Sequence, residues 1–169
     1  MTQRGLMTGP LLVFFTAVLT VITQCSNGPS TDANTVIATS KAAAQFCVSH
    51  EPITLRALKQ GDKHVVVVVK SFQPTNPPSA GLVVSLLTAN KTKRHEITRF
   101  AVHPLRAFSA KEPKQHQRFL VSLKEEAQYI EDGQPLCLEV GFDASRGKLE
   151  GGIAEIYIEL VQVAGTPEK

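Results

Sequence analysis

The feature that most constrains the fold is an uninterrupted run of five valines, Val65 to Val69. Valine branches at its β-carbon, which restricts χ1 and favours extended backbone over helix. Successive side chains of a strand point to opposite faces, so a run that is apolar at every position predicts a central strand covered on both faces. The segment His64 to Lys70 is therefore expected to form a buried strand of a β-rich domain.

Other segments alternate between apolar and polar residues, as is typical of strands with one buried face. A weakly alternating stretch at 53–58 predicts a first strand, and a strongly apolar strand at 81–87 follows the valine run after a proline-rich connection. The remaining expected strands are 97–103, 118–123, 136–142 and 153–160. About seven strands separated by turn residues predict a mainly β domain, an antiparallel β-sandwich spanning residues 47–164.

One short helix is expected within this domain, at about 123–131. Ser122 followed three residues later by Glu125 is the signature of a capping box. Apolar residues then recur at helical spacing as far as Ile130. Gly133 stands just beyond, where helices commonly end on a left-handed residue.

The N-terminal segment, residues 1–25, predicts export. Arg4 precedes an uncharged stretch from Leu6 to Ile22, which is the layout of a secretory signal or a hydrophobic anchor helix. The residues around Cys25 resemble a bacterial lipobox, and this resemblance implies that Cys25 is lipidated and becomes the first mature residue. A lipoprotein, an uncleaved membrane anchor and ordinary signal cleavage all remain open. Each predicts an exported protein, and the first two predict attachment to a membrane, in the periplasm or at the cell surface.

Two segments flank the expected domain without contributing to its core. Residues 26–46 are rich in Ser, Thr, Asn, Ala and Gly, which predicts a flexible tether. Residues 165–169 are expected to be a disordered tail.

The cysteines predict a disulfide. If Cys25 is lipidated, Cys47 and Cys137 remain, and export would take them to a compartment where disulfides persist. The bond would close a loop of about 90 residues and join the start of the domain to a late strand. The alternative is two separate buried thiols.

Charge is distributed unevenly along the chain. The segment 91–118 has a net charge of +6, and the segment 119–160 has a net charge of −6. These segments could be solvated faces that partly neutralise each other, or the first could form a basic patch for an anionic partner. No pattern of stacking aromatic residues accompanies the basic residues, so nucleic acid is not expected as a partner.

The sequence offers no recognisable catalytic machinery. The five histidines are scattered, without the i, i+4 spacing of paired metal ligands. The glycine-rich run at 141–148 has five residues between its glycines where a phosphate loop has four, and Leu149 stands where that motif has Ser or Thr. No nucleophile elbow is present. We therefore assign no catalytic, cofactor-binding or metal-binding residue and expect a protein that is not an enzyme and needs no cofactor.

Residues 100–161 resemble the C-terminal β-sandwich of tyrosinase and polyphenol-oxidase proteins. The likeness rests on Phe-Ala-Val-His-Pro-Leu at 100–105, Leu-Cys-Leu-Glu-Val at 136–140 and the closing strand up to Val161. In that family the sandwich packs over a separate copper domain whose histidine motifs have no counterpart here. The resemblance implies an accessory or shielding module and carries over no copper ligand.

The sequence thus leads to two main functional hypotheses, beside a third, a hydrolase whose catalytic residues meet only in the folded chain. The first is an exported, membrane-tethered β-sandwich with a non-catalytic binding or structural role in the cell envelope, whose partner is another protein. The second is an accessory or copper-handling module associated with a tyrosinase-like copper oxidase.

Overall fold

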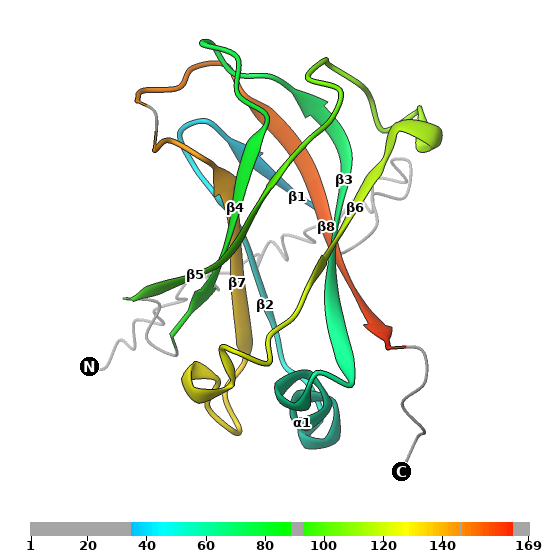
Figure 1. Cartoon of the computed structure of the whole chain (residues 1–169), viewed down its shortest axis with the longest axis vertical. Coiled ribbons are helices and arrows are strands. Elements are labelled where there is room, and N and C mark those ends of the chain that lie inside the picture. Colours follow the sequence, from blue (N-terminus) through cyan, green and yellow to red (C-terminus); the bar gives the residue numbers. More distant parts are fainter. Residues whose placement is uncertain (1–34, 89–92, 146, 164–169) are drawn as a thin grey trace, which may run out of the picture. The chain divides into compact units, whose positions relative to one another are not determined.

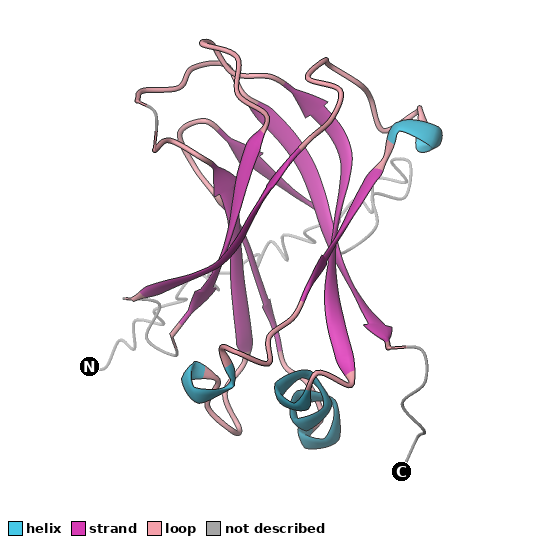
Figure 2. Ribbon diagram, in the orientation of Figure 1, coloured by secondary structure: helices cyan, strands magenta, loops and turns pink. Residues whose placement is uncertain are grey.

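The computed structural model describes residues 35–88, 93–145 and 147–163. Within these ranges eight strands form two antiparallel sheets of four strands each (Figures 1 and 2). The predicted fold class, a mainly β sandwich, is confirmed.

The first sheet, sheet A, has the strand order β1-β8-β3-β6. Its strands are β1 (Val36–Thr39), β8 (Ile153–Gln162), β3 (Lys63–Gln73) and β6 (Gln117–Val121). The valine run lies in β3, an inner strand, with Val65, Val67 and Val69 in the core. Val66 and Val68, which point to the other face, are also buried. The prediction of a strand covered on both faces is confirmed.

The second sheet, sheet B, has the order β2-β7-β4-β5. Its strands are β2 (Ala44–Val48), β7 (Leu136–Phe142), β4 (Gly81–Leu87) and β5 (Arg94–Ala101). Leu136, Leu138 and Val140 face the core, as their alternation predicts. Cys137 and Glu139 therefore point to the outer face of sheet B.

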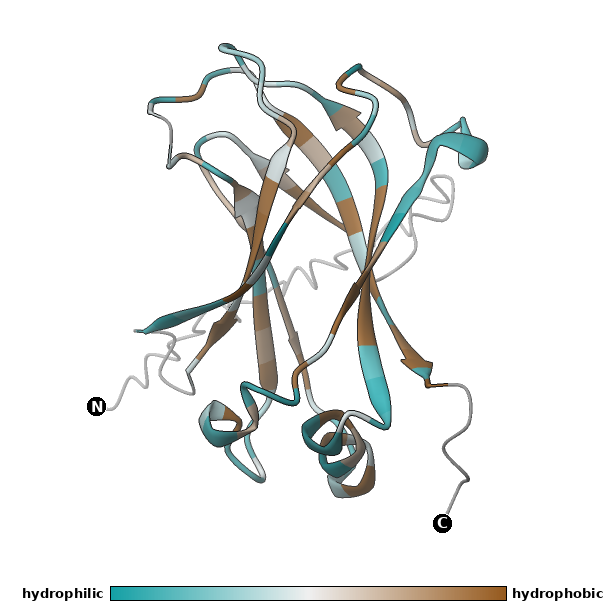
Figure 3. Cartoon of the chain, in the orientation of Figure 1, coloured by the Kyte–Doolittle hydropathy of each residue, from teal (hydrophilic) through white to brown (hydrophobic). Residues whose placement is uncertain are grey.

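The core lies between the two sheets and is filled mainly by aliphatic and phenylalanine side chains. Figure 3 shows hydrophobic segments along the strands of both sheets. Phe72 stacks against Phe108 and Phe142, with ring centroids 6.2 and 5.9 Å away. Phe100 and Phe119 stack at 3.8 Å between β5 and β6, which are edge strands of the two sheets.

The prediction of a first strand at 53–58 is wrong, because this segment belongs to helix α1 (Pro52–Gln60). Pro52 occupies the first turn, where its missing N–H costs nothing. Gly61 ends the helix with a φ of 83°, and its N–H donates to the carbonyl of Leu58. Leu55 and Leu58, three residues apart, are buried against the sandwich. These end signals and the helical spacing determine the structure, and the apparent alternation does not.

The short helix predicted at 123–131 is present only as a single 3-10 turn, η2 (Ala127–Tyr129), among other turns. The Ser122 hydroxyl accepts a hydrogen bond from the Lys124 N–H, so it closes a local turn instead of capping an α-helix. Ile130 is nevertheless buried, as predicted. A second 3-10 turn, η1 (Pro113–Gln115), precedes β6.

The predicted tether at 26–46 extends too far into the domain, because β1 and the start of β2 lie within it. Ala38 and Ala44 are buried, so small side chains fill positions where the two sheets come together. Residues 1–34, which include the predicted signal or anchor and Cys25, and the predicted tail lie outside the described residues. No helix within the described ranges has the length and apolar character needed to span a membrane.

Candidate functional site

A groove with a cavity volume of about 530 Å³ lies on the outer face of sheet B. Its walls are the corner between β1 and β2 and side chains of β2, β7, β4 and β5. The lining residues used below are Lys41, Gln45, Ser85, Arg94, Glu139 and Gly141. A Cβ atom at Gly141 would lie 3.0 Å from the Cβ of Ala43, so this glycine allows the corner to pack closely over β7.

Glu139 is the central polar side chain of the groove and is only 6% exposed. Burying a carboxylate is costly unless hydrogen bonds and opposite charge compensate for the lost water. Both of its oxygens have partners. Oε2 accepts from Nε2 of Gln45 at 3.0 Å, and Oε1 lies 3.0 Å from Nε of Arg94.

Strand register brings these three side chains together. Gln45 on β2 and Ser85 on β4 lie directly opposite Glu139, one on each side of β7. Arg94 on β5 is opposite Leu87, so its long side chain must cross β4 diagonally to reach the carboxylate. The site therefore draws on all four strands of the sheet.

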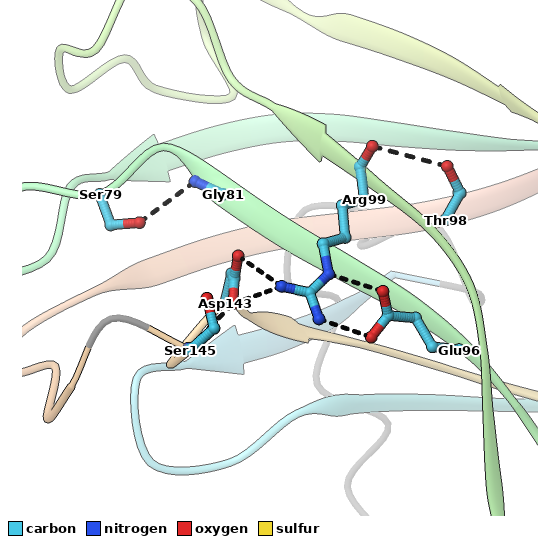
Figure 4. Close-up of polar contacts among 7 residues, drawn as sticks. All are labelled: Ser79, Gly81, Glu96, Thr98, Arg99, Asp143 and Ser145. Carbon is cyan, nitrogen blue, oxygen red and sulfur yellow. Dashed lines mark hydrogen bonds and ion pairs between the residues drawn. The ribbon is translucent and has the colours of Figure 1, made fainter.

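A second arginine, Arg99, forms a closed cluster on the same sheet (Figure 4). Its guanidinium lies between two carboxylates: Nε and one terminal nitrogen donate to Glu96 at 2.6 and 2.7 Å, and the other terminal nitrogen donates to Asp143 at 3.1 and 3.2 Å. These bonds raise the pKa of Arg99 and lower the pKa of Glu96.

Acidification below about pH 4 is expected to remove a stabilising contribution of Asp143. Its carboxylate accepts a 2.9 Å hydrogen bond from the Ser145 N–H, which together with Arg99 holds the pKa of Asp143 below its ordinary value of 3.8. The unfolded chain therefore takes up this proton at a higher pH than the folded chain. The contribution is fully present above that ordinary value and is lost as the pH falls through the folded pKa.

Asp143→Asn should accordingly flatten the dependence of the free energy of unfolding on pH between about pH 5 and pH 2. Urea titrations at several pH values measure this slope. Glu125→Gln is the matched control, since this exposed acid makes no hydrogen bond to another described residue. Identical slopes for Asp143→Asn and the unmodified chain would contradict the expectation.

On the outer face of sheet A, Arg118 pairs with Glu159 across β3, with its two terminal nitrogens at 3.2 and 2.5 Å from the carboxylate. The Tyr157 hydroxyl also donates to Glu159, and the ammonium of Lys70 lies 5.2 Å from the Tyr157 ring centroid. The hydrogen bond from Tyr157 lowers the pKa of Glu159 and raises the pKa of Tyr157.

The uneven charge of the sequence is partly neutralised by the fold. Three arginines of the basic segment reach carboxylates of the acidic segment, in the pairs Arg94–Glu139, Arg99–Asp143 and Arg118–Glu159. In each pair the arginine comes from an edge strand and crosses an inner strand. The hypothesis of partly neutralising segments is supported over that of one continuous basic patch.

The predicted disulfide is confirmed: Cys47 on β2 and Cys137 on β7 are directly opposite and bonded. The bond lies on the outer face of sheet B, two residues along each strand from the Gln45–Glu139 pair. Cys137 is buried and Cys47 is exposed. The disulfide therefore fixes the register that places Gln45 against Glu139.

The five histidines are distributed over different elements. His64 lies on β3, His95 lies on β5 and stacks on Tyr129 at 3.7 Å, and the others lie in connections. No group of three His, Cys, Asp or Glu side chains suited to a metal ion occurs in the described parts of the chain. The copper-handling hypothesis stays a prediction with no residues assigned to it.

Sequence reasoning did not predict the groove. The sequence places Gln45 in the expected tether and puts Arg94 and Glu139 in the basic and acidic segments, with nothing to connect them. A usable signal was present, because a Cys47–Cys137 bond between antiparallel strands puts Gln45 opposite Glu139. Arg94 gave no such signal, since its approach depends on which strand lies beyond β4.

Comparison with protein-family models, with curated proteins and with solved structures finds no match for this chain. The resemblance to the tyrosinase sandwich therefore stays an expectation, and the groove must be interpreted from its own chemistry.

Proposed function

We propose that this protein is an exported, membrane-tethered β-sandwich that binds a protein partner of the cell envelope without catalysing a reaction. The observation that carries the proposal is the groove on sheet B, in which a buried Glu139 is held by Gln45 and Arg94. A buried, fully partnered carboxylate fixes the orientation of the side chains around it.

Two further properties support binding at this face. The groove volume of about 530 Å³ lies within the range of roughly 300–1,000 Å³ typical of ligand sites. Arginine is also enriched at protein interfaces, because its planar guanidinium combines a charge with several directed donors. The outer face of sheet B thus offers a defined shape and a polar pattern to a partner.

Export is supported by the Cys47–Cys137 disulfide, since such bonds persist in oxidising compartments. The apolar stretch from Leu6 to Ile22 supports membrane tethering. Intact-mass measurement of the membrane-extracted protein tests how it is tethered. A mass for an acylated chain beginning at Cys25 indicates a lipoprotein, a full-length mass indicates an anchor, and a shorter unacylated mass would contradict tethering.

Site-specific cross-linking in intact cells tests the binding face. A photoreactive residue at Ala42, an exposed position on the groove wall, is expected to give an adduct of higher mass. The same residue at Leu120, which is 63% exposed on the outer face of sheet A, serves as the control and should give none. No adduct from Ala42, or equal adducts from both positions, would overturn the proposal.

A further inference from the structure

Three arginines cross an inner strand to reach a carboxylate, but their guanidinium groups are not equally occupied. Arg99 uses Nε and both terminal nitrogens, and Arg118 uses both terminal nitrogens on Glu159. Arg94 contacts Glu139 through Nε, and within the described residues its two terminal nitrogens have no hydrogen-bond partner. Its side chain is 66% exposed. Arg94 is thus the one arginine of the three whose paired terminal donors are open to a ligand.

The contacts of Glu139 explain why the two terminal nitrogens of Arg94, here called the Arg94 fork, remain available to a ligand. Its second oxygen accepts a hydrogen bond from Gln45, which holds the carboxylate in the orientation that meets Arg94 at Nε. A guanidinium that meets its carboxylate at Nε keeps its outer edge, with two parallel N–H donors, available to a carboxylate or another planar oxyanion. Glu139 and Gln45 act as positioning residues that orient this edge of Arg94.

Lys41 adds a second positive charge to the lining of the groove. It lies in the corner between β1 and β2, and its ammonium makes no ion pair with another described residue. The formal charges of the lining are those of Lys41, Arg94 and Glu139, which leave an excess of one positive charge. One carboxylate balances this excess, whereas a phosphate dianion would exceed it. The Ser85 hydroxyl supplies a neutral donor beside the charged groups.

From this arrangement we infer that the groove binds an acidic peptide segment of the partner, with an Asp or Glu carboxylate received by the Arg94 fork and by Lys41. The inference rests on the proposed function and specifies the chemistry of the ligand. Both cations lie on an accessible surface, so the affinity should decrease as the salt concentration rises.

The test is a chemical-shift titration of the ¹⁵N-labelled full chain in detergent micelles. The probe is the capped peptide acetyl-Ala-Ala-Glu-Ala-Ala-amide. The matched control peptide contains Gln in place of Glu. The glutamate peptide is expected to shift the Gln45 side-chain amide and to bind about tenfold more tightly than the glutamine peptide, because only the former makes charge-assisted bonds. Glutarate and inorganic phosphate are titrated in the same way, and both are expected to bind more weakly than the glutamate peptide.

Substitutions in the groove test which residues bind the glutamate peptide. Arg94→Gln is expected to weaken binding of the glutamate peptide about tenfold. Since this change also removes the charged partner of a buried carboxylate, Lys41→Gln provides a second variant at an exposed position, with an expected loss of about threefold. Lys93→Gln removes the same charge from the residue next to Arg94, which does not line the groove, and should leave the affinity unchanged.

Equal affinity for the glutamate and glutamine peptides, or no loss in both Arg94→Gln and Lys41→Gln, would overturn the inference. Tighter binding of phosphate or glutarate than of the peptide would also overturn it and would indicate a small-anion site. If the peptide fails but Ala42 still cross-links to a partner in cells, the proposed function stands and only the ligand chemistry is wrong. If the peptide binds but no adduct forms, the proposed partner interaction fails instead.

Discussion

Removing the Cys47–Cys137 disulfide is expected to lower the free energy of unfolding by about 4–5 kcal/mol. The two cysteines are 90 residues apart, so the bond excludes most of the open conformations of the unfolded chain. The folded sandwich also depends on it locally. β2 is an edge strand of five residues whose one partner among the described strands is β7, and the bond joins these two strands.

The double variant Cys47→Ala/Cys137→Ala and the reduced unmodified chain should lose similar stability in urea titrations followed by circular dichroism. Cys25→Ala is the control, because it removes a thiol that takes no part in this bond. A loss below about 1 kcal/mol would contradict the expectation and would mean that β2 is held by its ladder and its buried side chains alone.

Phe72→Ala is expected to lower the free energy of unfolding by about 3–5 kcal/mol. Phe72 is 2% exposed and stacks on both Phe108 and Phe142. Truncation therefore removes a large buried apolar surface and leaves a cavity between the two remaining rings, which belong to separate segments of the chain. Sandwich cores of this kind collapse little around a deletion, because the sheets hold the surrounding backbone in place.

Phe119→Ala is the matched control for this prediction. Phe119 also stacks on another phenylalanine, but it lies half-buried between the edge strands β5 and β6. The same truncation there should lower the free energy of unfolding by less than half as much as Phe72→Ala, because less of the Phe119 ring is removed from water in the folded chain. Equal losses at Phe72 and Phe119 in urea titrations would show that burial does not determine the difference.

Local sequence patterns predicted a strand and its buried face correctly where the order of apolar and polar residues was unambiguous. The valine run specified an inner strand of sheet A, and the alternation in 136–142 specified which side chains of β7 enter the core. The same parity placed Cys137 and Glu139 on the outer face. These predictions hold because the two-residue period of a strand is fixed by its own backbone.

Local patterns failed where competing signals overlapped. Residues 53–58 alternate weakly, yet Pro52 and Gly61 mark the two ends of a helix, and α1 forms there. The tether predicted at 26–46 takes in β1 and the first three residues of β2, because this segment is poor in large apolar groups, although Ala38 and Ala44 are buried. A small side chain contributes little to a hydrophobic pattern even when tight packing between two sheets requires it.

A mainly β sandwich and the inward faces of β3 and β7 follow from the sequence alone, which also names Cys47 and Cys137 as a candidate disulfide. Only the tertiary structure decided that Gln45, Glu139 and Arg94 meet on one outer face, because their approach depends on the lateral order of β2, β7, β4 and β5. Strand order is set by the packing of the whole core and leaves no periodic trace in any single strand. The orientation of the Arg94 fork, from which the ligand chemistry is inferred, follows from that order.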